Sequence, residues 1–282
     1  MITMENYVYR NFTKELLDQA YDNTRAVAAS REILGSFSAR SAEISEQFQE
    51  TMDMRYGPLP RECLDYFSCG KKGAPLFVFI HGGYWQMRNK EIFRFVAKGP
   101  LAHGFNVANI GYPLAPDVGI GDIVASVRSA FSYLHIHSDE LGFDSTHIYV
   151  SGWSAGAHLA VSVLDETGVC GALAISGIYD LEPISKCYLN DKLQLTENEI
   201  LLYSPLRRPF LKKSVVVVVG ANELPELRRQ SVEFAMRRAG DNIPGSFNLL
   251  SNQVHFTILE ELENPEGSLT QLLVQLTKCK RR

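Results

Sequence analysis

The chain has 282 residues, 45% of them hydrophobic, and a formal net charge of -4 at pH 7. This length and composition suffice for one large core, and α/β domains of this size are common as single units. The mild charge gives no basic field for nucleic acid, and the sequence contains neither a membrane-spanning run nor the apolar core of a signal peptide. We therefore expect a cytoplasmic protein without nucleic-acid or membrane partners.

Residues 1–62 are helix-like and fairly polar, without the alternation that marks strands. We interpret them as an N-terminal helical segment that packs on the main domain and is placed to roof a functional site. The stretch 55–69 is expected to supply one or two early antiparallel strands.

From Leu76 onward, apolar strand-like runs alternate with helix-like stretches. The five consecutive valines at 215–219 indicate a strand that is buried on both faces. The stretch 181–212 interrupts the pattern and is interpreted as a short cap-like excursion. The predicted strands are 76–80, 105–110, 147–150, 171–176, 214–220 and 246–251, and the predicted helices are 120–137, 155–164, 225–240 and 268–278.

This alternation predicts the α/β class, with a mostly parallel central sheet and helices on both of its faces. We expect a single domain over residues 1–282. In such sheets, ligands bind beyond the carboxyl ends of the strands. Functional side chains are therefore expected directly after the strands.

A serine lies between two glycines where a predicted strand becomes a predicted helix. The segment Gly152-Trp153-Ser154-Ala155-Gly156 matches the pattern G-x-S-x-G. In this context the pattern is typical of a nucleophile elbow, a tight turn in which larger flanking residues would clash. The first N–H groups of the new helix point toward the same place. We predict that Ser154 is a catalytic nucleophile.

A serine hydroxyl needs a base, and after a nucleophile elbow the acid and then the histidine follow along the chain. Only His158 and His255 follow Ser154. His158 lies four residues on, inside the helix, and leaves no room for an acid between. We therefore assign His255 as general base and then as general acid, and interpret His158 as a packed helical residue.

Two carboxylates are candidates for the third member of a triad. Glu223 follows the run of valines, and Asp180 follows the predicted strand 171–176. We favour Glu223 and keep Asp180 as the alternative. The acid would hold the tautomer of the imidazole and stabilise the imidazolium.

The loop HGGYW at 81–85 is the candidate partner of the serine in an oxyanion hole. Gly82 and Gly83 allow the backbone to approach a substrate closely. We expect N–H donors from Gly83, Tyr84 and Ala155, whereas His81 is expected to brace the loop.

Four aromatic residues lie next to the expected site in the sequence. They predict a substrate with an aryl group, because flat rings suit such a group. The candidate substrate-binding residues are Tyr84, Trp85, Trp153 and Tyr179.

The segments HGGYWQ, GYPLAP, GWSAGAHLA, SGIYDLEP, PELRRQS and NQVHF resemble the kynurenine formamidase (arylformamidase) group of the α/β-hydrolase superfamily, and YDNTRAV near the N-terminus is similar to a motif there. The resemblance covers about residues 55–280. It implies the α/β-hydrolase fold and hydrolysis of N-formyl-L-kynurenine to kynurenine and formate. The group carries Asp in a His-Asp pair at the acid position, where this chain has Asn222-Glu223.

We thus expect a serine hydrolase that cleaves a small acyl amide of an aryl amine, with a carboxylesterase for short acyl or aryl esters as the alternative. A non-catalytic binding protein is disfavoured because every member of the triad is present. No cofactor is expected, because the sequence contains neither H-E-x-x-H nor a phosphate-binding Gly-rich loop. Its five cysteines have no metal-ligand spacing and fit free thiols in a reducing compartment. The oligomeric state, monomer or homodimer, stays open.

Overall fold

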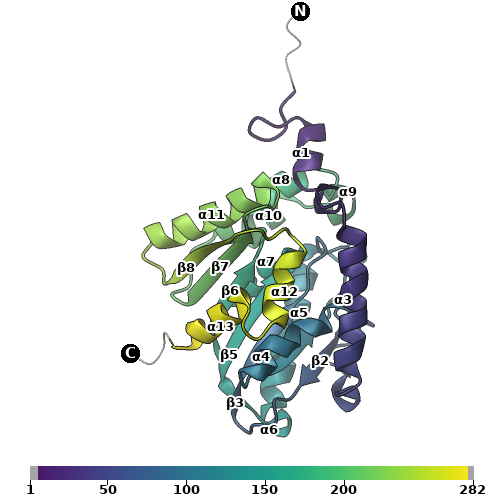
Figure 1. Ribbon diagram of the computed structural model, residues 1–282. Coiled ribbons are helices and arrows are strands. Elements are labelled where there is room, and N and C mark those ends of the chain that lie inside the picture. Colours follow the sequence, from purple (N-terminus) through teal and green to yellow (C-terminus); the bar gives the residue numbers. More distant parts are fainter. Residues whose placement is uncertain (1–5, 279–282) are drawn as a thin grey trace, which may run out of the picture.

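The computed structural model describes residues 6–278, which form one eight-stranded sheet (Figure 1). The strand order is β1-β2-β4-β3-β5-β6-β7-β8. β2 runs antiparallel to both of its neighbours, whereas the pairs from β4 to β8 are parallel. The strands are β1 (Met54–Arg55), β2 (Cys63–Phe67), β3 (Ala74–Ile80), β4 (Asn106–Ile110), β5 (Phe143–Trp153), β6 (Val169–Ile175), β7 (Ser214–Gly220) and β8 (Gly245–Leu250).

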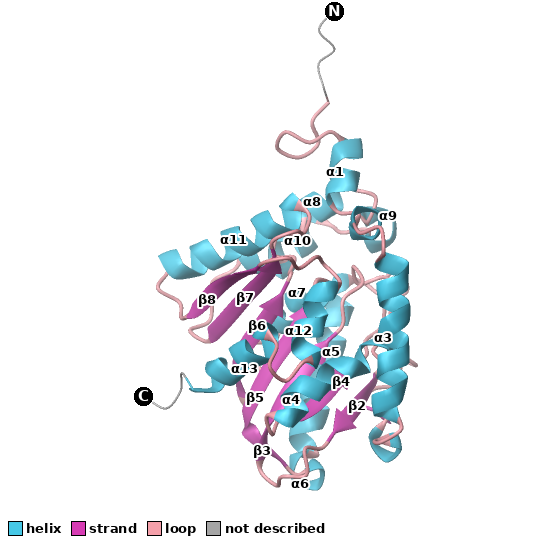
Figure 2. Ribbon diagram, in the orientation of Figure 1, coloured by secondary structure: helices cyan, strands magenta, loops and turns pink. Residues whose placement is uncertain are grey.

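Helices cover both faces of the sheet (Figure 2), which confirms the predicted fold class. No helix within residues 6–278 combines the length and the apolar character that crossing a membrane requires. The α-helices are α1 (Lys14–Ala20), α2 (Asn23–Ala26), α3 (Ser30–Ser45), α4 (Lys98–Ala102), α5 (Ile120–Ile136), α6 (Ser138–Leu141), α7 (Ala155–Ser162), α8 (Glu182–Ser185), α9 (Asn190–Leu193), α10 (Glu197–Tyr203), α11 (Pro225–Gly240), α12 (Glu260–Glu263) and α13 (Ser268–Lys278).

The residues of β3 show how the sheet separates two hydrophobic cores. Leu76, Val78 and Ile80 belong to the core that includes side chains of α5, α7 and α11. Phe77 and Phe79 belong to the core that includes side chains of α3, α12 and α13. All five side chains are fully buried. Because successive residues of a strand face opposite sides, a strand covered on both faces is apolar throughout.

The N-terminal segment packs along the sheet and reaches the excursion that follows β6. In α3, the ring of Phe37 packs against Phe95, with ring centroids 4.5 Å apart. Figure 1 shows α1 beside α8 and α9, and the backbone N–H of Tyr188 donates to Asp18 Oδ1 (2.7 Å). The excursion is mostly short helices, α8 to α10. The two irregular regions of the sequence therefore meet above the carboxyl ends of the strands.

Candidate active site

Ser154 occupies the sharp turn between β5 and α7. Its backbone has φ 59° and ψ −121°, a region that non-glycine residues rarely adopt. A Cβ atom on Gly152 would lie 2.1 Å from the carbonyl oxygen of Gly156, and one on Gly156 would lie 2.0 Å from the carbonyl oxygen of Ile80. Both flanking residues are therefore glycine because the turn lies directly against the backbone. Strain of about 1–3 kcal/mol at such a residue is typical of functional sites.

Glu223 and His255 meet beside this turn. His255 Nδ1 lies 2.7 Å from Glu223 Oε2, and both side chains are buried. The other carboxylate oxygen, Oε1, accepts hydrogen bonds from the N–H of Gly220 (2.7 Å) and the hydroxyl of Ser176 (2.5 Å). The carboxylate is thus fixed by three donors, and Nδ1 is the nitrogen of His255 that carries a proton. Nε2 remains available as the base.

Ser176 was not predicted from the sequence, although it follows β6 directly. Its backbone has φ 52°, and its N–H donates to the carbonyl oxygen of Val218 (2.7 Å). A serine immediately after a strand that ends at the site is the signal that would have indicated it.

The buried side chain of Trp153 packs against His255 and forms a hydrogen bond with its backbone. Its indole N–H donates to the carbonyl oxygen of His255 (2.7 Å), and the two ring centroids are 4.6 Å apart. Trp153 is almost fully buried, yet it contributes to the lining of the pocket described below. Its main contacts thus position His255.

The loop that follows β3 approaches the serine closely, as expected of an oxyanion hole. A Cβ atom on Gly82 would lie 2.6 Å from the carbonyl oxygen of Trp153 and 3.0 Å from Cβ of Ser154. Gly83 and Tyr84 have φ of 120° and 51°. The backbone N–H groups of Gly83, Tyr84 and Ala155 donate no hydrogen bond to residues 6–278. Three donors are therefore available near the serine.

His81 braces this loop. Its Nδ1 donates to the carbonyl oxygen of Gly82 (2.7 Å), and its ring stacks on Tyr112 with centroids 4.2 Å apart. Burial lowers the pKa of His81 to about 3, so the ring is neutral near pH 7. The ring is fully buried and does not line the pocket that contains Ser154, so it is not positioned to act as a base for this serine.

Tyr84 joins the loop to the N-terminal segment. Its buried hydroxyl donates to the carbonyl oxygen of Tyr21 (2.6 Å) and accepts from Asn23 Nδ2 (2.8 Å). Burial raises the pKa of this hydroxyl well above its usual range, which keeps it protonated. The sequence did not identify Asn23, because the contact joins segments about 60 residues apart.

Two predicted substrate-binding residues lie elsewhere, and the expectation that they contact a substrate is corrected. Trp85 is fully buried, and its indole N–H donates to His158 Nδ1 (3.2 Å). His158 Nε2 in turn donates to the carbonyl oxygen of Tyr203 (2.7 Å), and burial lowers its pKa to about 4. Tyr179 is also fully buried and stacks on Phe234 with ring centroids 4.0 Å apart. Neither ring lines the pocket that contains Ser154.

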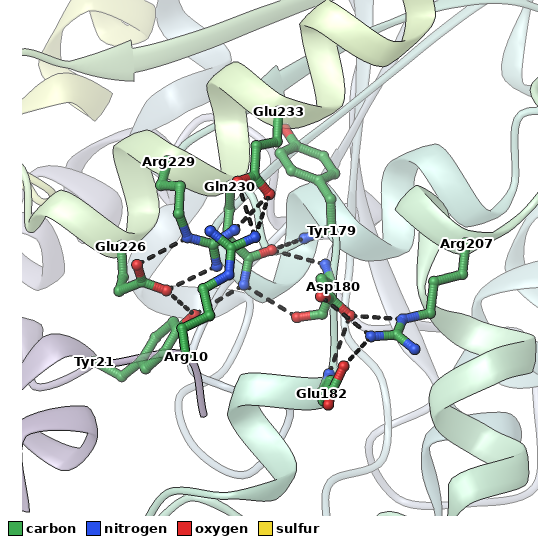
Figure 3. Close-up of polar contacts among 10 residues, drawn as sticks. All are labelled: Arg10, Tyr21, Tyr179, Asp180, Glu182, Arg207, Glu226, Arg229, Gln230 and Glu233. Carbon is green, nitrogen blue, oxygen red and sulfur yellow. Dashed lines mark hydrogen bonds and ion pairs between the residues drawn. The ribbon is translucent and has the colours of Figure 1, made fainter. Parts of the chain in front are cut away.

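Asp180, the alternative acid, is engaged in a different network (Figure 3). Its carboxylate pairs with Arg207, with Nε at 2.9 Å, and accepts from the N–H of Glu182. Gln230 of α11 accepts from the N–H groups of Tyr179 and Asp180 and donates to the hydroxyl of Tyr21 (2.9 Å). This network fastens the N-terminal segment to α11 and to the start of the excursion. The structure brings Glu223, and not Asp180, to His255.

Ser154 and His255 line one small pocket of about 40 Å³. Within residues 6–278, no hydrogen bond joins these two side chains, and catalytic contacts of this kind often tighten only with substrate bound. The N-terminal segment and the excursion both contribute residues to the lining of the pocket. The lining residues are Asn23, Thr24, Gly83, Tyr84, Met87, Arg88, Trp153, Ser154, Tyr188, His255 and Phe256.

The chain is similar to several known proteins. A family model named BD-FAE matches residues 66–167. A protein of Danio rerio named kynurenine formamidase is 32% identical, over 95% of this chain and 98% of that protein. A kynurenine formamidase of Salmo salar is 35% identical, over 81% of this chain and 82% of that protein.

Solved structures share the fold. A Silicibacter protein named provisionally as a thioesterase superimposes with a TM-score of 0.81 and 25% identity, and covers 92% of this chain and 98% of its own. The esterase LipW of Mycobacterium marinum has a TM-score of 0.71 at 17% identity, with coverage of 91% and 92%. The fold is therefore the α/β-hydrolase fold, and the protein is a hydrolase of amides or esters. With relatives this similar over nearly its whole length, the chain belongs to the kynurenine formamidase family.

Proposed function

We propose that the protein hydrolyses N-formylkynurenine to kynurenine and formate, with Ser154, His255 and Glu223 as its catalytic triad. The observation that carries this proposal is the short contact between His255 Nδ1 and Glu223 Oε2 at a pocket that Ser154 also lines. The names of the relatives supply the substrate.

In the proposed first step, Ser154 Oγ attacks the formyl carbon while its proton moves to His255 Nε2. The negative charge that develops on the formyl oxygen is stabilised by the N–H groups of Gly83, Tyr84 and Ala155. The C–N bond then breaks, and the imidazolium returns the proton to the departing aryl amine. Ser154 is left as a formyl ester.

In the second step, His255 removes a proton from a water molecule that attacks the formyl ester. The ester bond to Ser154 breaks, the serine recovers its proton from His255, and formate leaves. Glu223 stabilises the imidazolium in both steps. Its second oxygen accepts hydrogen bonds from Gly220 and Ser176, which hold the end of the longer Glu side chain.

The size of the pocket supports a small acyl group. A water molecule needs roughly 10–15 Å³ of such space, so 40 Å³ accommodates on the order of three waters. A formyl group, with two heavy atoms, fits this space. The aryl part of the substrate would extend beyond this space, toward the exposed lining residues Thr24 and Tyr188.

The second candidate is a carboxylesterase for short acyl esters, which the names of structural neighbours such as LipW favour. The two functions use the same machinery and differ in the leaving group. The test compares kcat/KM for N-formylkynurenine with the values for p-nitrophenyl acetate and p-nitrophenyl butyrate. Formamidase function predicts the highest value for N-formylkynurenine and a steep fall from acetate to butyrate. Cleavage of both esters without release of kynurenine would overturn the proposed substrate.

A further inference from the structure

Arg88 is the only permanently charged side chain among the residues that line the pocket with Ser154 and His255. The side chain is half-buried. Burial alone lowers the pKa of its guanidinium, and no carboxylate within residues 6–278 is close enough to oppose that effect. Desolvated cations in proteins are normally paired, because an unpaired one forfeits its hydration without compensation. An unpaired cation at a substrate pocket therefore indicates a ligand of opposite charge.

The loop holds Arg88 in place through its backbone and its aliphatic stem. The residue has φ 74°, a conformation that L-residues rarely adopt, and its carbonyl oxygen accepts a hydrogen bond from Arg61 Nη2. Its Cγ atom would lie 3.2 Å from a Cβ atom built on Gly83. The side chain thus begins directly beside a predicted oxyanion donor. Backbone strain of this kind persists where the surrounding structure determines it and is often tied to function.

The guanidinium also contacts the loop that carries the base. Its Cζ atom lies 5.9 Å from the centroid of the Phe256 ring, within the range of a weak cation–π interaction. Phe256 follows His255 directly. The side chain therefore lies between the loop 81–85 and the loop that carries His255, and the residue is partly exposed to solvent.

We propose that Arg88 is a specificity-determining residue that binds a carboxylate on the leaving-amine part of the substrate. The small space beside Ser154 takes the acyl group, so the larger leaving part must extend toward the partly exposed guanidinium. A guanidinium binds a carboxylate through two parallel hydrogen bonds, which fixes orientation as well as charge. This inference adds to the proposed function. It depends on that proposal only in assuming that Ser154 is the nucleophile. N-formylkynurenine has such a carboxylate.

The test uses substrates that differ only in this group. N-formylkynuramine lacks the carboxylate of N-formylkynurenine and keeps its amine. We expect Arg88→Met to lower kcat/KM for N-formylkynurenine roughly 10- to 100-fold, mainly through KM, and to leave N-formylkynuramine within about threefold. Arg88→Lys should recover part of the loss. Arg31→Met removes an exposed cation of α3 that does not line the pocket. It is the matched control and should change kcat/KM for neither substrate.

An equal loss for both formamides in Arg88→Met would assign Arg88 a structural role and overturn the proposal. A second pair, 3-acetoxybenzoate and phenyl acetate, applies the same comparison to ester cleavage. If the wild-type protein cleaves esters but neither formamide, the proposed formamidase function is wrong. The ester pair then still tests whether Arg88 binds a carboxylate on the leaving group.

A binding measurement on the wild-type protein needs neither turnover nor a folded variant. Kynurenine should protect Ser154 from a fluorophosphonate probe at concentrations at least tenfold below those that kynuramine requires. Equal protection by the two compounds would overturn the proposed carboxylate site.

Discussion

Glu223 Oε2 lies 2.7 Å from His255 Nδ1, and the same carboxylate accepts hydrogen bonds from Gly220 and Ser176 through its other oxygen. These three hydrogen bonds hold the carboxylate of Glu223 toward the imidazole. The arrangement also shows how the side chain proposed as the triad acid is held beside the histidine. The backbone N–H of Gly220 and the hydroxyl of Ser176 fix the end of the longer side chain.

Replacement of Glu223 by Gln keeps the shape of the side chain but removes its charge. The amide then favours the wrong tautomer of His255, and we expect kcat to fall by about 10³- to 10⁴-fold, as for the corresponding change in a serine protease. Steady-state kinetics with N-formylkynurenine provides the measurement. Asp180→Asn is the control, because Asp180 pairs with Arg207, and it should retain more than a tenth of the activity. The reverse order of the two effects would show that Asp180 is the acid.

Replacement of Ser154 separates catalysis from backbone strain. Ser154→Ala and Ser154→Gly should both lose activity, but only glycine adopts φ 59° and ψ −121° without strain. We expect Ser154→Gly to be more stable than Ser154→Ala by about 1 kcal/mol in free energy of unfolding. Urea denaturation of the two variants measures the difference. A more stable alanine variant would show that the turn is not strained.

A methyl group on Gly82 would displace the loop 81–85, which is the proposed oxyanion hole. The added Cβ would lie 2.6 Å from the carbonyl oxygen of Trp153, which is backbone and cannot move away alone. We expect Gly82→Ala to lower kcat by about 10²- to 10³-fold, the usual effect of losing an oxyanion donor. Gly35→Ala is the matched control, since nothing lies within 4 Å of its new Cβ atom. Gly35→Ala should keep full activity. An equal loss of kcat in both variants would contradict the assignment of the loop 81–85 as the oxyanion hole.

The buried histidines predict how stability depends on pH. Burial lowers the pKa of His158 to about 4, so the unfolded chain, with a pKa near 6.5, binds more protons than the folded chain between these values. Stability is therefore lost as the pH falls from 6.5 toward 4, with a contribution from this residue of roughly 2 kcal/mol by pH 5.

The measurement is the free energy of unfolding of the wild type and of His158→Gln at several pH values between 5 and 6.5. The free energy of unfolding should depend less steeply on pH in the variant. The difference in slope should correspond to about one bound proton, or about 1.4 kcal/mol per pH unit. Identical slopes would mean that His158 is not buried as a neutral ring. His81, with a pKa of about 3, should contribute in the same direction.

Features that depend on local sequence could be predicted. The run of valines forms β7. The segment that matches G-x-S-x-G forms a turn in which Gly152 and Gly156 lie directly against backbone atoms. The strand was predictable because a strand buried on both faces is apolar throughout. The turn was predictable because only glycine fits so close to the backbone. Of the antiparallel strands expected within 55–69, β2 lies inside this stretch, whereas β1 begins one residue before it, at Met54.

Features that depend on side-chain direction could not be predicted. Tyr84 and Trp85 are neighbours with similar positive φ, yet Tyr84 lines the pocket while Trp85 contacts His158. Nearness to a motif in sequence does not determine which side chain faces a cavity. Asn23 and Tyr188 line the same pocket from segments that have no motif, because tertiary packing alone brings them there.

The central claim is that the oxygen of Ser154 is the nucleophile and that His255 activates it. Peptide mass spectrometry after treatment with a fluorophosphonate probe tests this directly. We predict an adduct on Ser154 in the wild type, none in Ser154→Ala, and labelling at least 10²-fold slower in His255→Ala. Modification at another residue, or kynurenine release by Ser154→Ala at the wild-type rate, would contradict the account.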